Sequence, residues 1–241
     1  MGFQSAQKAR ALVGTLNLSG YAKSVSVTWN QDALDVTTLV DTAKAFIVGQ
    51  DTATAAISLL YDTDTTAGGE YDFIQGTWKT TQPQPLTYAP AGLTTGSPAL
   101  LMSALETTTG GNVSASGLPM MDVSAQVDGP TDMGTVLEDL TAITATGNGT
   151  ARDLTAASTN GGVAHLHVTA FSGLTSNTVT IEHSVDGSTS WATLATFTAA
   201  TGITSQRVVV AAGTSVRRFL RVVDTVVGTG SNTRSVSFAR R

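Results

Sequence analysis

The sequence predicts an all-β protein of two domains, with one or two short helices. Short runs rich in Val, Ile and Thr alternate with polar residues and are separated by Gly, Asn and Asp, a pattern typical of half-buried strands and turns. The 241 residues suit two ordinary domains. The charge changes sign near residues 130–150, where Gly and Thr accumulate, and this change separates a predicted domain of residues 1–140 from one of residues 141–241.

Strands dominate the prediction for the first domain. In its last strand Val123, Ala125 and Val127 alternate with polar residues, so one face of the strand is apolar. The predicted strands of this domain lie within residues 11–20, 24–30, 52–62, 85–90 and 114–129.

Two segments of the same domain carry helical signals. Tyr71, Ile74 and Trp78 fall on one helical face, although Gly76 between them lowers helix stability by about 1 kcal/mol. Residues 97–106 begin with Ser-Pro, which suits the N-cap and first position of a helix, but they fit a strand equally well.

The second domain carries only β signals. A strand is predicted over residues 161–171, a hairpin turns at Asp186-Gly187, and a further pair of strands turns at Ala212-Gly213. Six or more strands at a spacing of roughly 10–15 residues predict a small Ig-like β-sandwich.

The content and distribution of charged residues indicate which partners the surface can contact. Only 13 % of residues are charged, against about 25 % in an average soluble protein, which suits a surface largely covered by copies of itself. Residues 1–140 hold five Lys/Arg and fourteen Asp/Glu, a net charge of −9, whereas residues 141–241 carry +4. An acidic half binds DNA phosphate poorly, but it can form a wall that DNA passes without adhering.

Several classes of protein are disfavoured by the sequence. The chain has no cysteine, which excludes disulfides, thiolate metal sites and Cys nucleophiles. Neither a signal peptide nor an apolar run of about 20 residues is visible. We therefore expect synthesis in a cytoplasm and no membrane partner.

Candidate chemistry is sparse. His165 and His167 place two imidazoles on one face of a strand, a spacing that can chelate a metal with His183 as a third ligand. No acid completes such a site nearby in sequence, so a polar strand face is favoured, and no metal or cofactor is expected. The sequence contains neither a Gly-x-Ser-x-Gly elbow nor a Walker motif, so no catalytic residue is assigned and no enzyme activity is expected.

Two other groups in the second domain each allow two interpretations. Arg217, Arg218 and Arg221 either contact acidic partners or form a solvated face that covers apolar surface; the solvated face is favoured, and DNA binding is the weaker alternative. Trp191 either stacks on a sugar or fills the sandwich core, and the core is favoured.

Three segments, in the right order, resemble the tail tube (major tail) proteins of bacteriophages with long non-contractile tails. The third comprises GGVAHLHVTAFSG, IEHSVDGSTSWATL and VRRFLRV, similar to the appended C-terminal domain of such proteins. One departure is Leu39-Val40, where the family more often has an aromatic residue and Gly. The first two segments match at Asp35, Val36, Thr37, Thr38, Asp41, Lys44, Gly49, Ile57, Ser58, Tyr61 and Asp62, and at Pro90, Gly92, Gly96, Ser97 and Pro98.

This resemblance implies a structural virion protein. Its first domain is expected to be a β-sandwich flanked by a helix, with strands that join a ring-shaped β-barrel of six copies. Rings are expected to stack into a tail tube that carries double-stranded DNA without specific binding, with C-terminal domains decorating the outside. Tail terminator, tape measure and tail-tip proteins are the implied partners, with host-surface contact by the C-terminal domain as an option.

The segment Gln31–Gln50 is too long for an ordinary hairpin loop and is expected to be an arm that bridges subunits or rings. The alternatives to a tail tube are a surface adhesion or carbohydrate-binding protein and a capsid decoration protein. The expected contact residues of the arm are Asp35, Val36, Thr37, Thr38, Leu39, Asp41 and Lys44, and the acids expected at the lumen are Asp62, Asp122 and Asp128.

Overall fold

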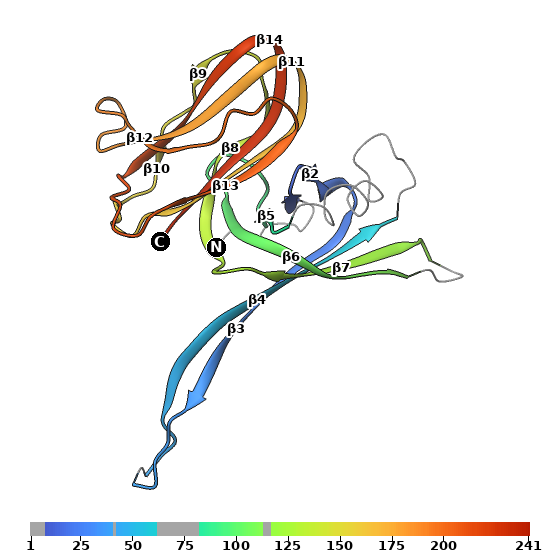
Figure 1. The fold of residues 1–241 in the computed structure, drawn as a ribbon, viewed down its shortest axis with the longest axis vertical. Coiled ribbons are helices and arrows are strands. Elements are labelled where there is room, and N and C mark those ends of the chain that lie inside the picture. Colours follow the sequence, from blue (N-terminus) through green and yellow to red (C-terminus); the bar gives the residue numbers. More distant parts are fainter. Residues whose placement is uncertain (1–7, 41, 62–81, 113–116) are drawn as a thin grey trace.

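The computed structural model describes residues 8–40, 42–61, 82–112 and 117–241 (Figure 1). Within these ranges the protein is all-β, as predicted, and its strands form one connected network of antiparallel pairings. The described ranges include one short 3-10 helix, η2 (Leu18–Gly20). The predicted helix over residues 71–78 lies outside the described residues. No helix of the described part is both long enough and apolar enough to cross a membrane.

The N-terminal half combines a small body with a long hairpin. β3 pairs with β4, β4 with β7 and β7 with β6, and β5 and β1 continue the sheet beyond β6. Val123, Ala125 and Val127 are buried in the core of this half, which confirms the predicted alternation. The strands are β1 (Arg10–Val13), β2 (Leu16–Asn17), β3 (Ala22–Asp35), β4 (Phe46–Leu60), β5 (Gln84–Ala89), β6 (Pro98–Asn112), β7 (Met120–Val127) and β8 (Asp132–Ile143).

The segment of residues 97–106, which fitted a helix or a strand, forms strand β6 from Pro98 onward. Its apolar run is continuous because β6 separates two cores. Leu100 and Met102 face the core that contains Val123, whereas Ala99 and Leu101 face a second cluster. A strand buried on both faces lacks the alternation that marks a half-exposed strand, so the sequence alone left the choice open.

Two long strands build the C-terminal half. β11 and β14 pair along almost their whole length and curve together (Figure 1). The register shifts where they curve, between Val168 and Ser176, and Gly230 lies at this bend with a φ of +156°. The strands of this half are β9 (Gly147–Asn148), β10 (Arg152–Asp153), β11 (Gly162–Ser184), β12 (Ala192–Thr196), β13 (Thr204–Val210) and β14 (Phe219–Arg240).

The bend lets β11 and β14 contribute to both layers of one core. Residues 162–168 of β11 pair with β13, and residues 180–183 pair with β12. Leu166 from the first stretch and Ile181 from the second are buried in the same cluster. A β-bulge with glycine is the usual device for turning a strand from one layer into the next.

Two details differ from the sequence prediction. The strand over residues 161–171 and the first strand of the Asp186-Gly187 hairpin are one continuous β11. β13 and β14 do not pair with each other; each pairs with β11, on opposite edges. The turn at Asp186-Gly187 does connect β11 to β12 as predicted, with Gly187 at a φ of +74°.

The two halves meet in a third apolar cluster. It holds Leu12 and Leu101 from the N-terminal half together with Val163 and Ala239 from the C-terminal half. β8 also pairs with both β6 and β14, so it connects the halves through its backbone. The boundary at residue 140 stays a prediction.

Candidate interaction arm

The arm is the part of the β3–β4 hairpin that extends away from the body (Figure 1). Near the body the ribbon has one apolar and one polar face, as expected for a half-buried sheet. Val25 and Val27 pack with the N-terminal core, whereas Ser26 and Thr28 point to the opposite side and are exposed. This alternation fixes which face of the ribbon is buried.

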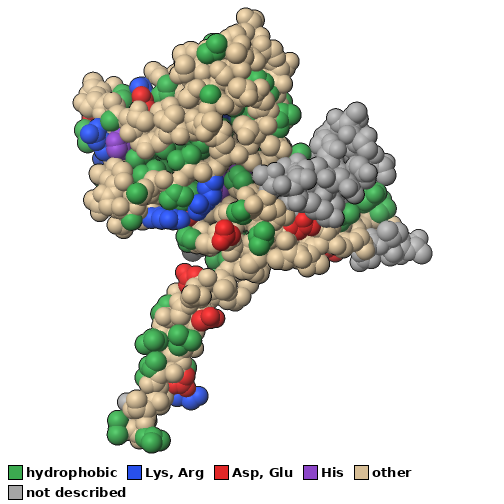
Figure 2. Space-filling view, in the orientation of Figure 1, with side chains coloured by type: hydrophobic (Ala, Val, Ile, Leu, Met, Phe, Trp, Pro, Cys, Tyr) green, Lys and Arg blue, Asp and Glu red, His purple; other side chains and the backbone are tan. Residues whose placement is uncertain are grey.

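Toward its end the ribbon becomes apolar on both faces. Leu34 lies opposite Ile47 on one face, and Phe46 and Val48 lie on the other. All four side chains are more than half exposed, and Val48 is 70 % exposed. Figure 2 shows hydrophobic side chains along the arm, in green. A two-stranded ribbon with no body behind it is marginally stable in water, so this part of the molecule calls for a covering partner.

A defined turn closes the arm. Asp35 Oδ1 accepts a hydrogen bond from Thr37 N at 2.9 Å, and Thr37 Oγ1 accepts one from Ala45 N at 3.0 Å. The side-chain and backbone hydrogen bonds from Thr37 lower the pKa of Asp35. Beyond this turn Leu39 and Val40 are almost fully exposed.

The predicted contact residues lie together on this arm. Asp35, Val36, Thr37, Thr38, Leu39 and Lys44 belong to its last strand pair and its turn, and all are exposed. Asp41 lies outside the described residues. The structure thus brings the predicted residues to one projecting element, while their role in subunit contacts stays a prediction.

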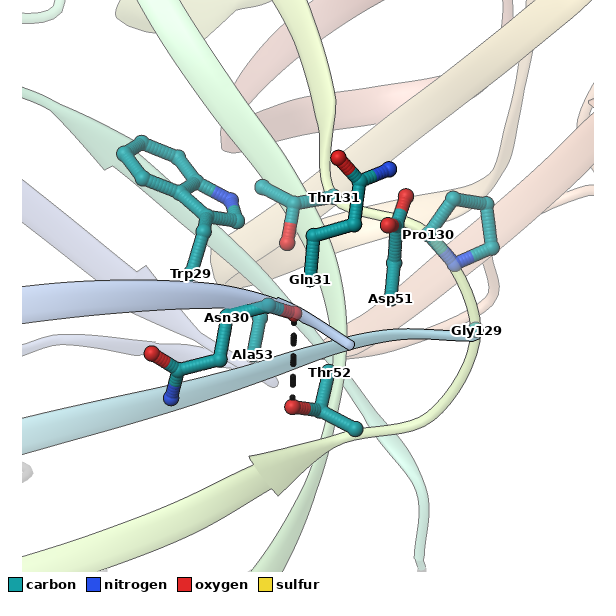
Figure 3. A pocket seen from close by; sticks show the side chains of 9 residues that line it. All are labelled: Trp29, Asn30, Gln31, Asp51, Thr52, Ala53, Gly129, Pro130 and Thr131. Carbon is teal, nitrogen blue, oxygen red and sulfur yellow. Dashed lines mark hydrogen bonds between the residues drawn. The ribbon is translucent and has the colours of Figure 1, made fainter. Parts of the chain in front are cut away.

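A recess of about 310 Å³ lies where the arm leaves the body. Figure 3 shows Trp29, Gln31 and Asp51 rising on one side of the ribbon, with Pro130 and Thr131 of the β7–β8 turn beside them. This side is the apolar core face, which continues past the end of the body. Trp29 is consequently 51 % exposed.

Two strand edges of the N-terminal half lack a partner strand among the described residues. β3 pairs only with β4 along its 14 residues. β6 pairs with β5 only as far as Ala104, and Glu106 N donates a hydrogen bond to Gln82 Oε1 at 2.8 Å, so the same edge of residues 107–112 meets no described strand. Free edges are templates for pairing with another chain.

The polar face of the β3–β4–β7–β6 sheet is rich in Ser and Thr. It includes Ser26, Thr54 and Ser124, which oppose buried neighbours on the same strands. Asp122 lies on this face and accepts a hydrogen bond from Ser58. Asp128 is exposed directly after β7, and Asp62 lies outside the described residues. Their exposure to a lumen stays a prediction.

The two histidines of the predicted chelate are buried between the halves of the chain. Thr87 Oγ1 lies 3.1 Å from His165 Nδ1 and 2.8 Å from His167 Nε2, and His167 Nδ1 lies 2.7 Å from the Gly14 carbonyl. Since His167 Nδ1 donates to that carbonyl, its Nε2 accepts the Thr87 hydroxyl proton, and Thr87 accepts from His165 Nδ1. One alternating chain of donors and acceptors therefore holds both rings neutral.

Burial explains the titration of this pair. Desolvation lowers the pKa of His167 to about 4. Desolvation first, and then repulsion from a protonated His167 and from Arg207, lowers the pKa of His165 well below its ordinary value. The predicted polar strand face is confirmed, since Ala164, Leu166 and Val168 lie in the sandwich core while the two histidines face Thr87 and Gly14; both histidines are nevertheless fully buried. No cluster of three or more His, Cys, Asp or Glu side chains forms in the described residues.

The arginines of the C-terminal half are largely occupied within the chain. Arg218 forms a bidentate pair with Asp153 and lowers the pKa of that carboxyl group to about 2. Arg221 pairs with Glu182 at 2.7 Å and covers the ring of Trp191 at 4.2 Å from its centroid. Trp191 is half-buried and lies outside the sandwich core, so its assignment to the core was wrong; its ring is the platform for Arg221.

Comparison with known proteins gives distant structural similarities. No family model and no curated protein matches the chain. A chain of the virion of a native gene transfer agent particle is 13 % identical and has a TM-score of 0.40, over 54 % of this chain and 98 % of the other. A chain from the tail of an empty gene transfer agent particle with C6 symmetry is 13 % identical and has a TM-score of 0.41, and the match covers 54 % of this chain and 97 % of the other.

A third similarity covers nearly the whole chain. The Dit protein of phage SPP1, described as a paradigm of the hub adsorption apparatus in phages that infect Gram-positive bacteria, is 10 % identical with a TM-score of 0.40. It covers 96 % of this chain and 98 % of its own. All three TM-scores lie below 0.5, so neither the function nor the assembly of this protein is inferred from them.

Sequence reasoning did not find the recess or the free edges. The recess joins residues about 80–100 positions apart, such as Trp29 and Thr131, and no local pattern marks them as neighbours. The arm was predicted from the length of the segment between the strands predicted over residues 24–30 and 52–62.

Proposed function

We propose that the protein is a structural virion subunit, without enzyme activity, that assembles into stacked rings of six copies and forms the tail tube of a phage. The tube is the conduit for double-stranded DNA during ejection. The observation that carries this proposal is the projecting arm, whose apolar side chains lie on both faces. A monomer gains nothing from such an arm, whereas a copy that covers it removes both apolar faces from water.

The free edges support closure into a ring. In the order β3–β4–β7–β6 every neighbour is antiparallel, so the outer strands β3 and β6 run in opposite directions. The β3 edge of one copy can therefore pair antiparallel with residues 107–112 of the next. Repeated around an axis, this pairing closes a barrel and leaves no sheet edge open.

The polar face of that sheet suits the inside of the barrel. Its Ser and Thr side chains are uncharged, so they offer hydrogen-bonding surface without attracting DNA phosphate. Asp122 contributes a negative charge there, which repels DNA and keeps the conduit from binding its cargo. The C-terminal half, residues 141–241, would then decorate the outside of the tube.

Replacing the turn tests this function. Residues 36–45 are exchanged for Asn-Gly, which suits a two-residue hairpin loop directly after the last strand pair, Asp35 opposite Phe46. The proposal predicts folded monomers that no longer polymerise, because the body keeps its core while the tip is lost. Deleting residues 36–46 is expected to act in the same way.

Electron microscopy and sedimentation of the purified chain provide the measurement. Hollow rings or tubes of uniform width are expected from the unaltered protein, also after addition of tail-tip components if nucleation is needed. Normal tubes from the turn replacement would contradict the role of the arm. A parent chain that stays monomeric with tip components present would contradict the tube itself.

A further inference from the structure

We propose that the recess at the base of the arm is the acceptor for the arm tip of another copy of this chain. The inference rests on the proposed assembly and names the contact that links one ring to the next. The tip is the turn beyond Asp35, with Leu39, Val40 and Lys44, and the recess is lined by Trp29, Gln31, Asp51, Ala53 and Pro130 among others.

The recess is an unfinished end of a hydrophobic core. Ala53 is buried at its floor and belongs to the N-terminal core, whereas the indole of Trp29 is half exposed above it. The turn at Gly129–Thr131 is the last part of the body that lies beside this face of the ribbon (Figure 3). An apolar side chain placed here would extend the existing core, and burying it would contribute about 25 cal/mol for each Å² of apolar surface removed from water.

The tip supplies side chains of the matching kind. Leu39 and Val40 are the most exposed large apolar residues of the described chain. The recess of about 310 Å³ is large enough for one or two aliphatic side chains and too small for a folded domain. An extended turn at the end of a thin ribbon is the shape that can enter it.

The charges are complementary as well. Lys44 is the cation of the tip and makes no ion pair with any described residue. Asp51 lies at the rim of the recess, is exposed, and likewise has no ion pair among the described residues. A Lys44–Asp51 contact between copies would fix the orientation of the tip more than it would add affinity.

The distance between tip and recess within one chain makes the contact head-to-tail. Six residues of β3 separate Trp29 from Asp35, or roughly 20 Å at about 3.3 Å per residue, and Leu39 lies in the turn beyond Asp35. A copy therefore cannot fill its own recess, and each docked copy offers a new recess at its other end. Such a contact repeats without limit along one direction, with an axial step set by the length of the arm.

Cysteine cross-linking tests the contact directly, because the chain has no cysteine of its own. The double variant Val40→Cys/Thr131→Cys is assembled, oxidised and analysed on denaturing gels. A ladder of covalent oligomers is expected, since a tip in the recess brings the two Cα atoms within the roughly 4–7 Å that a disulfide needs. A mixture of the two single variants should give dimers and no ladder.

A charge exchange gives an independent measurement. Lys44→Asp and Asp51→Lys alone are each expected to raise the concentration needed for assembly by at least fivefold, and the double exchange is expected to restore it. Asp139→Lys on β8 is the matched control, because Asp139 is exposed and lies away from both tip and recess.

The outcomes separate this inference from the proposed function. If tubes form but no cross-linked ladder appears, and the charge variants assemble at the parent's concentration, the recess is not the acceptor, although the proposed tube is unaffected. A parent chain that never assembles would overturn the proposed function. A ladder together with rescue by the double exchange would support both.

Discussion

The N-terminal and C-terminal halves differ in how much of their strand edges and apolar side chains the chain itself covers. The N-terminal half leaves the outer edge of the 14-residue strand β3 without a partner strand among the described residues, and it exposes apolar side chains along its arm. The C-terminal half bends two long strands over one core, and its edge strands β12 and β13 have only five and seven residues. Short edges limit unwanted pairing. The first half therefore exposes edge and apolar surface that another chain could cover, whereas the second covers more of its own.

Their charged groups follow the same division. Seven of the eight arginines in residues 141–241 donate a hydrogen bond or form an ion pair within the chain. In the arm, Lys44 and Asp51 have no ion pair among the described residues. A half whose cations are engaged internally has little to offer DNA phosphate, although its net charge is positive.

The largest effect on stability is expected at Arg234. Its side chain is fully buried, and it binds Asp224 and, at 2.8 Å, Glu138. Burial opposes its charge, but both carboxylates raise its pKa above the ordinary value. Arg234→Met leaves Asp224 buried without its partner and is expected to lower the free energy of unfolding by about 3–5 kcal/mol in urea denaturation.

A second variant isolates the cause of this loss. Arg234→Met combined with Asp224→Asn and Glu138→Gln removes the stranded charges, so it should lose less stability than the single substitution. Arg218→Met, at an exposed pair, serves as the control. An Arg234→Met variant as stable as that control would show that the buried network does not hold the C-terminal half together.

Acid is expected to act at the junction between the halves. Well above pH 6.5 both histidines are neutral in the folded and the unfolded chain, so they cause almost no pH dependence there. Below pH 6.5 the unfolded chain binds protons that buried His165 and His167 do not, and stability falls by roughly 1.4 kcal/mol per pH unit for each until the folded pKa is reached. For His167 that limit lies at about pH 4.

Chemical denaturation between pH 7.5 and 5.5 measures this fall. About 1–2 kcal/mol should be lost for each histidine over that range. His165→Asn keeps a donor toward Thr87 but cannot titrate. The slope of the unfolding free energy against pH should therefore fall by the contribution of one proton, about 1.4 kcal/mol per pH unit. An unchanged slope would mean that other groups cause the acid sensitivity.

The histidines also show where sequence reasoning ends. Local patterns correctly gave the core face of β7, from its alternation, and the turn after β11, from Asp186-Gly187, because residues close together in the sequence decide both. Whether His165 faces water or another part of the chain depends on Thr87, 78 positions away. The continuous β11 was missed for the same reason, since Gly173 resembles a strand break until β14 is paired beside it.

A smaller, kinetic effect is expected on the polar face of the N-terminal sheet. Asp122→Lys would place a cation where the proposal puts passing DNA, so ejection from virions that carry the variant should slow. Asp122→Asn is the control, since it removes the charge without reversing it. Unchanged ejection kinetics with Asp122→Lys would place this face outside the conduit.

The smallest effect is expected at the exposed pair of Arg218 and Asp153. Water screens this pair, since both side chains are more than 40 % exposed, and such pairs contribute at most about 1 kcal/mol. Asp153→Asn frees a cation without disturbing a core, so it should leave urea denaturation almost unchanged. It should also produce no DNA mobility shift at physiological salt, because one released arginine adds only one phosphate contact. A clear shift for the parent chain would instead show that the C-terminal half binds nucleic acid despite its internal pairs, and the contrast between the two halves would then lie in their ligands.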